Sequence, residues 1–222
     1  MGKINRFDLS RIVAKFKTPI FFETGTFRGD GVQYALQSPF KKIISVEIIP
    51  ELAEEAKKKF AGIERVKIIE GESSRVMEEE LPNLTGNCIF WLDAHFPGAD
   101  AGMTDYDAEM DESVRLPLVV ESSIINRLRK GFKDVIIMDD LRIYEDGPYQ
   151  NGNVPVDALP KKNRNINFVN QNFGDTHHIY KSYQEEGYLL LLPKLSRKRW
   201  SIANLFLPAV PKPTSYLKKE LA

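Results

Sequence analysis

Short apolar runs alternate with longer amphipathic segments along most of the chain. The apolar runs predict buried strands at residues 19–22, 42–47, 65–70, 87–93 and 135–138. Between them, apolar residues recur at helical spacing and predict helices over residues 8–17, 30–37, 50–60 and 117–130. Two last runs, at residues 176–182 and 188–192, flank a turn and predict a closing hairpin. The pattern is typical of an α/β fold, and we expect a mostly parallel sheet of seven strands that ends in an antiparallel hairpin.

The first apolar run ends in an acid that is followed by spaced glycines. Glu23 precedes Gly25, Gly29 and Gly31. Glycines at a strand-to-helix turn let the main chain approach a ligand closely, and the next helix offers free N–H groups. The spacing differs from the dinucleotide pattern G-x-G-x-x-G, and no Gly-Lys-Ser/Thr of a phosphate loop follows. We interpret the segment as a cofactor loop, with a simple tight turn as the alternative.

Acids also follow the next strands. Glu47 comes about twenty residues after the first acid, where nucleotide-binding α/β folds place a carboxylate on the ribose hydroxyls. A surface acid ahead of Pro50 is the alternative. Asp93 ends the fourth predicted strand, and Asp139 and Asp140 end the fifth. Neighbouring carboxylates repel one another unless water, basic partners or a cation offset the charge, so these three acids predict a site for Mg²⁺ or Ca²⁺.

The domain organisation follows from where the pattern is interrupted. Residues 96–116 lack clear periodicity, and a loop of this length predicts a substrate lid, with a merely mobile excursion as the alternative. We expect one domain over residues 1–193 that opens with a leading helix within residues 1–18. Residues 194–222 form a basic, proline-containing C-terminal extension that is expected to be solvated.

Composition narrows the class of protein. Lys+Arg and Asp+Glu both number 31 among 222 residues, so no net charge attracts nucleic acid or an anionic membrane. The single cysteine, Cys88, lies in an apolar run and suits a reducing compartment. No apolar stretch has the length of a membrane span, and we expect a cytoplasmic protein with a small-molecule partner. The sequence is compatible with a homo-oligomer, and His177 and His178 are expected to be structural or exposed.

The glycine loop, Glu47 and the acids Asp93, Asp139 and Asp140 together resemble the metal-dependent class I O-methyltransferases that use S-adenosylmethionine (SAM). Examples are catechol O-methyltransferase and the sugar O-methyltransferases of macrolide and aminocoumarin antibiotic pathways. The resemblance covers residues 19–140. It implies a Rossmann-like class I methyltransferase sheet with helices on both faces.

The resemblance also implies roles for individual residues. SAM would be held by the glycine loop, with Gly31 beside it, and by the turns after the next strands. The residues are Glu23, Gly25, Thr26 and Gly29 in the loop and Glu47, Glu72, Ser73 and Asp93 after it. Ser73 would contact the adenine, with helix capping by Ser73 or Ser74 as the alternative. In the antibiotic-sugar enzymes a base stands two residues after the strand-four metal ligand. That place holds His95 instead of the expected aspartate. The alternative is a histidine that fastens the lid or that hydrogen-bonds a metal ligand.

The expected function is Mg²⁺-assisted, SAM-dependent methylation of a hydroxyl of a sugar, a glycan or another vicinal diol. Metal coordination lowers the pKa of such a hydroxyl, and a histidine suits proton removal near neutrality. A non-catalytic SAM- or glycan-binding module and an NAD(P)-dependent oxidoreductase on a related fold are the alternatives, the latter disfavoured by the glycine spacing. A nucleic-acid methyltransferase is disfavoured because no basic stripe with interleaved aromatics accompanies the site.

Overall fold

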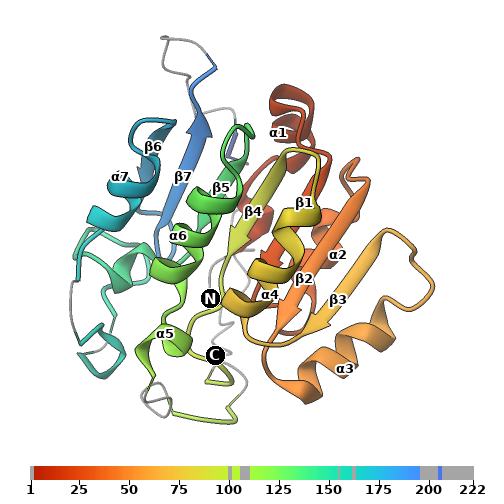
Figure 1. Ribbon diagram of the computed structural model, residues 1–222. Helices are drawn as coiled ribbons and strands as arrows, with labels where there is room; N and C mark the ends of the chain where they lie inside the picture. The colour runs from red at the N-terminus through yellow and green to blue at the C-terminus, as the bar shows by residue number, and fades with distance from the viewer. Residues whose placement is uncertain are drawn as a thin grey trace, which may run out of the picture.

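A seven-stranded sheet forms the centre of the protein (Figure 1). The computed structural model describes residues 3–99, 102–105, 111–154, 156–161, 164–195 and 205–206. The strands are β1 (Ile20–Thr24), β2 (Lys42–Glu47), β3 (Val66–Glu70), β4 (Cys88–Leu92), β5 (Val135–Met138), β6 (His177–Ser182) and β7 (Tyr188–Pro193). Their order is β3-β2-β1-β4-β5-β7-β6, with β1 to β5 parallel and β7 antiparallel to β5 and β6. This arrangement confirms the predicted fold class.

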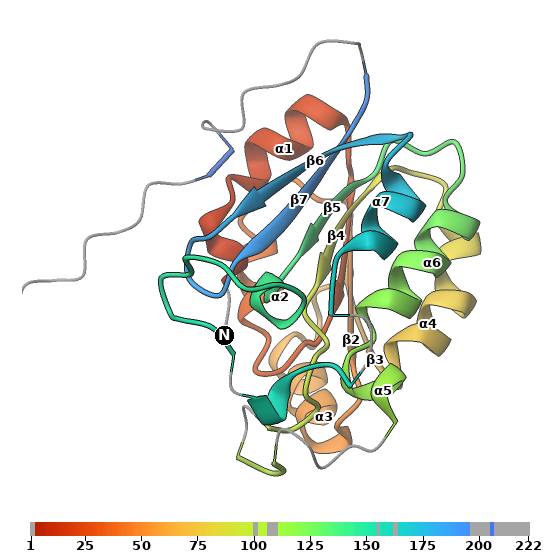
Figure 2. The ribbon, with the colours of Figure 1, turned by 90° about the vertical axis from the view of Figure 1, so that its left-hand side faces the viewer.

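Helices cover both faces of the sheet, with α4, α6 and α7 on one side and α1 and α2 on the other (Figure 2). The α-helices are α1 (Leu9–Phe16), α2 (Asp30–Ala35), α3 (Pro50–Lys59), α4 (Ser73–Glu80), α5 (Glu112–Arg115), α6 (Leu118–Leu128) and α7 (Asn167–Phe173). Short 3-10 helices are η1 (Ile4–Arg6), η2 (Leu81–Asn83), η3 (Leu141–Ile143) and η4 (Val156–Ala158).

Neighbouring residues of β1 face the two layers. Phe22 packs in the core beneath α4, α6 and α7, whereas Phe21 packs in the core beneath α1 and α2. Successive side chains of a strand point to opposite faces of its sheet. Because helices cover both faces, the central strands are apolar on both sides, as the sequence pattern predicted.

The strand register brings the ends of the central strands together. Thr24 at the end of β1 pairs with Val46 on β2 and with Leu92 on β4. Leu92 in turn pairs with Met138 at the end of β5. The residues that follow these strands therefore meet at one edge of the sheet, where open α/β sheets bind their ligands.

Several predicted boundaries differ from the structure by one or two residues. Strand β1 continues through Glu23 and Thr24, because Glu23 still pairs with Ser45 on β2. Glu23 is thus a buried strand residue and not the first residue of the turn. The helix predicted over residues 30–37 ends earlier, at Ala35.

Part of the C-terminal extension packs on the start of the chain. Leu205 is buried, and its carbonyl oxygen accepts a hydrogen bond from the Asp8 amide at 2.9 Å. Phe206 forms an antiparallel bridge with Phe7, and their ring centroids lie 4.8 Å apart. The expectation of a solvated extension is therefore wrong for this pair, since the apolar side chains complete the core beside α1. The remaining residues of the extension beyond Leu195 lie outside the described residues.

The two ends of the predicted lid are joined to each other. Phe96 and Leu116 are buried, and the Phe96 amide donates to the carbonyl oxygen of Arg115 at 2.9 Å. Residues 100–101 and 106–110 lie outside the described residues. The lid itself stays a prediction.

The opposite edge of the sheet holds a buried ion pair. Arg129 Nε and Nη2 donate to the two carboxylate oxygens of Asp134 at 3.0 and 2.9 Å, and Asp134 also accepts from the Cys88 amide at 2.7 Å. His177 Nε2 lies 3.0 Å from the Asp134 carbonyl oxygen, and burial lowers the pKa of His177 to about 4. His177 is therefore a neutral structural residue, as predicted.

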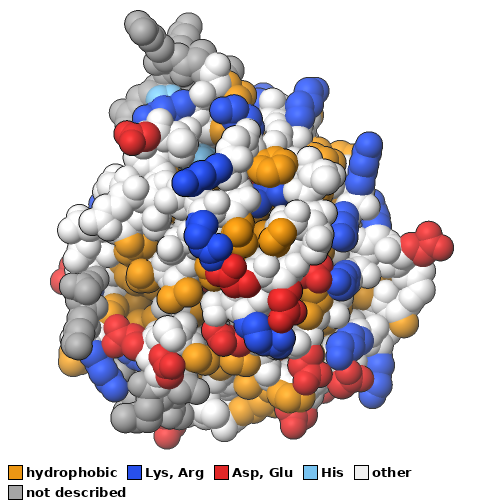
Figure 3. Space-filling view, in the orientation of Figure 1, with side chains coloured by type: hydrophobic (Ala, Val, Ile, Leu, Met, Phe, Trp, Pro, Cys, Tyr) orange, Lys and Arg blue, Asp and Glu red, His pale blue; other side chains and the backbone are white. Residues whose placement is uncertain are grey.

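Charged side chains of both signs lie on the face of the molecule that Figure 3 shows. Lysine and arginine side chains are interspersed with aspartate and glutamate on the face covered by α4 and α6 (Figure 3). Among the described residues, no helix combines the length and apolar character needed to cross a membrane.

Candidate active site

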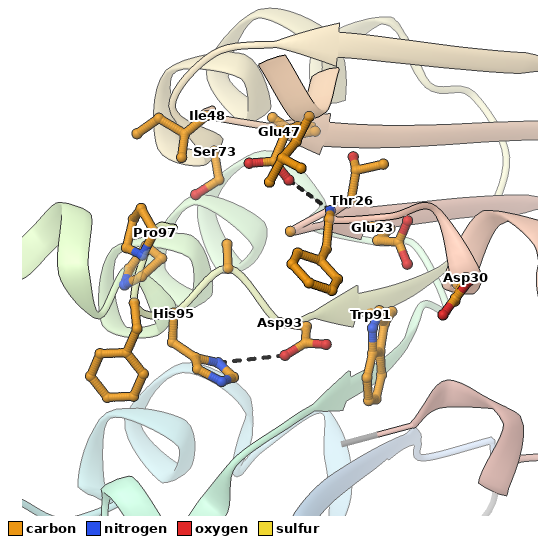
Figure 4. A pocket seen from close by; sticks show the side chains of 18 of the residues that line it. Glu23, Thr26, Asp30, Glu47, Ile48, Ser73, Trp91, Asp93, His95 and Pro97 are labelled. Atoms are coloured by element: carbon orange, nitrogen blue, oxygen red, sulfur yellow. Dashed lines mark hydrogen bonds and ion pairs between the residues drawn. The ribbon is translucent and has the colours of Figure 1, made fainter. Parts of the chain in front are cut away.

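A pocket of about 380 Å³ opens at the carboxyl edge of the sheet (Figure 4). Most of the predicted site residues line it, namely Glu23, Gly25, Thr26, Glu47, Glu72, Ser73, Asp93 and His95. Gly29 does not line it, and Asp139 lines a small adjoining cavity behind His95. The pocket is elongated, with Glu23, Asp30 and Trp91 toward one end and Ile48, Ser73 and Pro97 toward the other (Figure 4).

The glycine loop is shaped by close approaches of the main chain. Gly25 has a φ of 83°, and a Cβ there would lie 2.4 Å from the Asp93 carbonyl oxygen. A Cβ on Gly31 would lie 1.8 Å from Oε1 of Glu23. Gly29 adopts the left-handed conformation as the N-cap of α2 and lies over Phe60, so its contribution to the site is to the shape of the turn.

Glu23 is held beneath this loop. Ser45 Oγ donates to Glu23 Oε2 at 2.5 Å, and the Thr26 hydroxyl lies 2.6 Å from the same serine oxygen. Burial raises the pKa of Glu23 to about 8, although the hydrogen bond from Ser45 lowers it. The carboxyl group of Glu23 therefore offers a ligand a buried polar contact at one end of the pocket, near Asp30.

Glu47 presents an oriented carboxylate at the end of β2. The Phe27 amide donates to Oε2 at 2.7 Å and the Ile49 amide donates to Oε1 at 3.0 Å. Burial raises the pKa of Glu47, and these backbone hydrogen bonds oppose that rise. Each carboxylate oxygen has a second lone pair that can accept a ligand hydroxyl.

The turn after β3 presents Ser73 and Glu72 to the pocket. Glu72 occupies the N-cap position of α4 without capping it through its side chain, and its carboxylate accepts from the Ser74 hydroxyl. Neither Ser73 nor Ser74 is the N-cap residue of α4, so the alternative that one of them caps this helix does not hold.

Three ionisable side chains converge at the ends of β4 and β5. Asp93, His95 and Asp139 each offer a ligand atom, and these atoms all lie within 4.8 Å of one another. Asp139 is 3% exposed, and neither of its carboxylate oxygens has a hydrogen-bond partner. Burial and the neighbouring acids raise the pKa values of Asp93 and Asp139, that of Asp139 to about 7. Unpartnered carboxylate oxygens beside a second carboxylate fit an oxygen-preferring divalent cation.

Asp140 is placed differently from the expected third carboxylate ligand. Its φ of 56° is left-handed, and its oxygens face Arg142 Nε at 2.7 Å and His95 Nε2 at 3.1 Å. Burial favours the neutral acid, but the contacts with His95 and Arg142 outweigh it and lower the pKa of Asp140. The structure therefore groups His95 with Asp93 and Asp139 and leaves Asp140 as an anion behind the histidine.

His95 lies between the two acids. Nδ1 is 3.5 Å from Oδ1 of Asp93, on the pocket side, and the ring packs edge-on against Phe96 with centroids 5.4 Å apart. A neutral histidine whose Nε2 hydrogen points at Asp140 carries its basic lone pair on Nδ1, on the side of Asp93. This geometry suits a general base.

The sequence interpretation missed several lining residues. Lys3, Ile4 and Asn5 reach the pocket from the N-terminal segment, and Tyr34 reaches it from α2. Glu121 on α6 lines the small cavity with His95 and Asp139, and its Oε1 has no hydrogen-bond partner. Burial raises the pKa of Glu121 to about 7, opposed by the hydroxyls of Ser73 and Thr24. None of these residues stands in a motif, so only the folded chain reveals them.

Comparison with known proteins supports the fold. No protein-family model matches the sequence, and no curated protein matches it. Among solved structures, the chain is similar to the Podospora anserina methyltransferase PaMTH1 bound to S-adenosylhomocysteine (SAH), with a TM-score of 0.55, 15% identity, and coverage of 84% of this chain and 76% of that one. An O-methyltransferase from Bacillus cereus in complex with SAH aligns with a TM-score of 0.50, 12% identity, and coverage of 84% and 79%. The chain thus has the fold of SAM-dependent methyltransferases, as predicted.

Proposed function

We propose that this protein is a SAM-dependent O-methyltransferase that acts, with Mg²⁺ or a similar cation, on a hydroxyl of a sugar or another vicinal diol. The observation that carries the proposal is the position of Asp93, His95 and Asp139. Their ligand atoms converge where the elongated pocket meets the ends of β4 and β5. A pocket of about 380 Å³ is of the size that holds a cofactor or small substrate.

The pocket offers matching groups along the length of the cofactor. Ile48 and Ser73 lie toward the end that would receive adenine (Figure 4). Glu47 would accept hydrogen bonds from the ribose hydroxyls, since its oxygens are already oriented by two backbone amides. Glu23, with the loop residues Gly25 and Thr26, would hold the amino-acid end.

Asp93 and Asp139 would hold the divalent cation. When bound, the cation supplies Lewis-acid stabilisation that lowers the pKa of an acceptor hydroxyl. Two oxygen ligands from a vicinal diol would complete such a site, which is why we favour sugars or related acceptors.

His95 would remove the proton from the acceptor hydroxyl at Nδ1. SAM, held by Glu23, Glu47 and the glycine loop, would supply the methyl group: the acceptor oxygen would bond to the methyl carbon as the carbon–sulfur bond broke, and the electron pair would stay on the sulfur of SAH. The imidazolium that forms lies between the carboxylates of Asp93 and Asp140, which would stabilise its charge.

The surrounding segments fit this assignment. Phe96, Pro97, Gly98 and Val114 line the pocket, so we retain residues 96–116 as the segment that covers the acceptor. We place the reaction in the cytoplasm, where the free, buried Cys88 would stay reduced.

The test is methyl transfer from radiolabelled SAM to a panel of catechols and sugars, with added Mg²⁺ or with EDTA. We expect labelled product with at least one vicinal diol and a large loss of rate with EDTA that Mg²⁺ restores. Binding of SAM without transfer to any acceptor would favour the non-catalytic binding module. A rate of methyl transfer that EDTA leaves unchanged would show that the reaction does not need the metal.

A further inference from the structure

The N-terminal segment, residues 3–7, reaches the pocket and contributes part of its wall. Lys3, Ile4 and Asn5 line the pocket, and Ile4 is buried. The segment lies against α2 through the Tyr34 hydroxyl, which donates to the Phe7 carbonyl oxygen at 2.8 Å. The Phe7 ring is 6.3 Å from that of Trp91, at the end of the pocket that also holds Glu23.

A partly buried network fixes this segment in place. The Lys3 amide donates to the Tyr188 hydroxyl at 3.0 Å, and Tyr188 donates in turn to Glu185. Arg6 Nη2 donates to the other oxygen of Glu185 at 2.7 Å. Tyr188 is fully buried, and its ring packs on Phe7 with centroids 5.3 Å apart. The backbone of Lys3 is therefore held at the pocket, although its side chain belongs to an exposed residue.

The charges that line the pocket are unequal. The acidic residues among the described lining residues are Glu23, Asp30, Glu47, Glu72 and Asp93. Of the described residues that line it, Lys3 alone is a lysine or an arginine. The amino-acid end of SAM or SAH carries both an ammonium and a carboxylate group. Acidic side chains would bind the ammonium group but would leave the carboxylate without a positive partner.

From this placement we infer that Lys3 binds the carboxylate of the amino-acid end of the cofactor. The inference rests on the proposed function and adds a residue that lies outside the motifs of the sequence. The flexible stem of a lysine lets its ammonium group reach a ligand from an exposed backbone position. A charge-assisted hydrogen bond to a carboxylate is among the stronger polar contacts in proteins.

The competing location for the carboxylate is the first turn of α2. Asp30 occupies that turn and lines the pocket, and its exposed carboxylate lies 3.8 Å from Nζ of Lys59. A second carboxylate beside it would be repelled. Lys3 lines the same pocket and offers the opposite charge.

The test compares the affinities of two ligands by calorimetry. SAH carries the carboxylate, whereas decarboxylated SAM keeps the amino group and lacks the carboxylate. We expect Lys3→Ala to weaken SAH binding by about tenfold, and to change the affinity for decarboxylated SAM by less than about twofold. Lys3→Arg should retain most of the SAH affinity, and Lys130→Ala, an exposed lysine at the far edge of the sheet, should retain all of it.

The outcomes separate this inference from the proposed function. Wild-type protein that does not bind SAH overturns the proposed function itself. Unchanged SAH affinity in Lys3→Ala, with wild-type binding intact, overturns only the inference and returns the carboxylate to α2. Equal losses for both ligands would show that Lys3 supports the segment and does not recognise the carboxylate, which also overturns the inference.

Discussion

Nε2 of His95 lies 3.1 Å from Oδ2 of Asp140, a buried aspartate in the left-handed conformation. Non-glycine residues adopt this conformation at a cost, and such strain often accompanies functional sites. Arg142 holds the other oxygen of Asp140 at 2.7 Å. The histidine ring is thereby oriented with Nδ1 toward Asp93 and the pocket.

The base assignment predicts a selective loss of turnover. Replacing His95 by alanine should lower kcat by about 10²- to 10⁴-fold, because a positioned general base contributes that much. The Kd of SAH should change little, since the cofactor contacts remain. Initial rates and calorimetry on the same preparation check both values, and a kcat equal to that of the wild type would contradict the assignment.

The metal assignment predicts loss of cation binding in Asp139→Asn. Its carboxylate lies in the buried cluster with Asp93 and His95, so the amide removes an anionic ligand from that position. Calorimetric titration with Mg²⁺ should show binding to the wild type and none to the variant. Asp105→Asn, which changes an exposed acid, serves as the control and should bind Mg²⁺ normally. Mg²⁺ binding that survives in Asp139→Asn would place the cation elsewhere.

Glu121 predicts a pH-dependent stability difference. Its folded-state pKa of about 7 lies above the ordinary value of 4.5, so the folded protein keeps the proton to a higher pH than the unfolded chain does. The free energy of unfolding therefore falls as the pH rises from 4.5 to about 7. Glu121→Gln should match the wild type near pH 4 and exceed its free energy of unfolding by up to about 3 kcal/mol near pH 8. Urea unfolding at both pH values measures this, with Glu51→Gln as an exposed control. A difference that is the same at both pH values would contradict the assignment.

Two glycines with left-handed φ should respond differently to alanine. Gly25→Ala places its Cβ against the Asp93 carbonyl group, so we expect loss of SAH binding. Gly62→Ala has a similar φ but open space around its Cβ, so it should cost only about 1 kcal/mol of stability. Calorimetry and thermal unfolding distinguish them, and normal SAH binding by a folded Gly25→Ala variant would separate the loop from the cofactor site.

The sequence predicted the parts of the structure that depend on local pattern. Buried strands stand out as short apolar runs, and amphipathic helices as apolar residues at helical spacing. The sheet and its helices were therefore predictable. Glu47 ends a strand, and Asp93 and Asp139 follow strands, and the ends of these strands align. The proximity of the three acids was therefore predictable as well.

Other parts of the site depend on contacts that no local pattern encodes. The backbone twist at Asp140 turns its carboxylate toward Arg142 and His95, which neighbouring carboxylates in the sequence do not reveal. Lys3 lies at the pocket, where its amide is held by Tyr188, a residue far along the chain. Glu121 looks like any acid of an amphipathic helix until the packing of α6 buries it.

The central claim is that this pocket binds SAM, and calorimetric titration with SAH tests it most directly. Wild-type protein should bind SAH with a micromolar Kd. Glu47→Ala should weaken binding by about tenfold or more, because a buried, oriented carboxylate would no longer meet the ribose. Glu51→Ala, an exposed acid on α3, should bind as the wild type does. Absence of binding to folded wild-type protein at millimolar SAH would contradict the account.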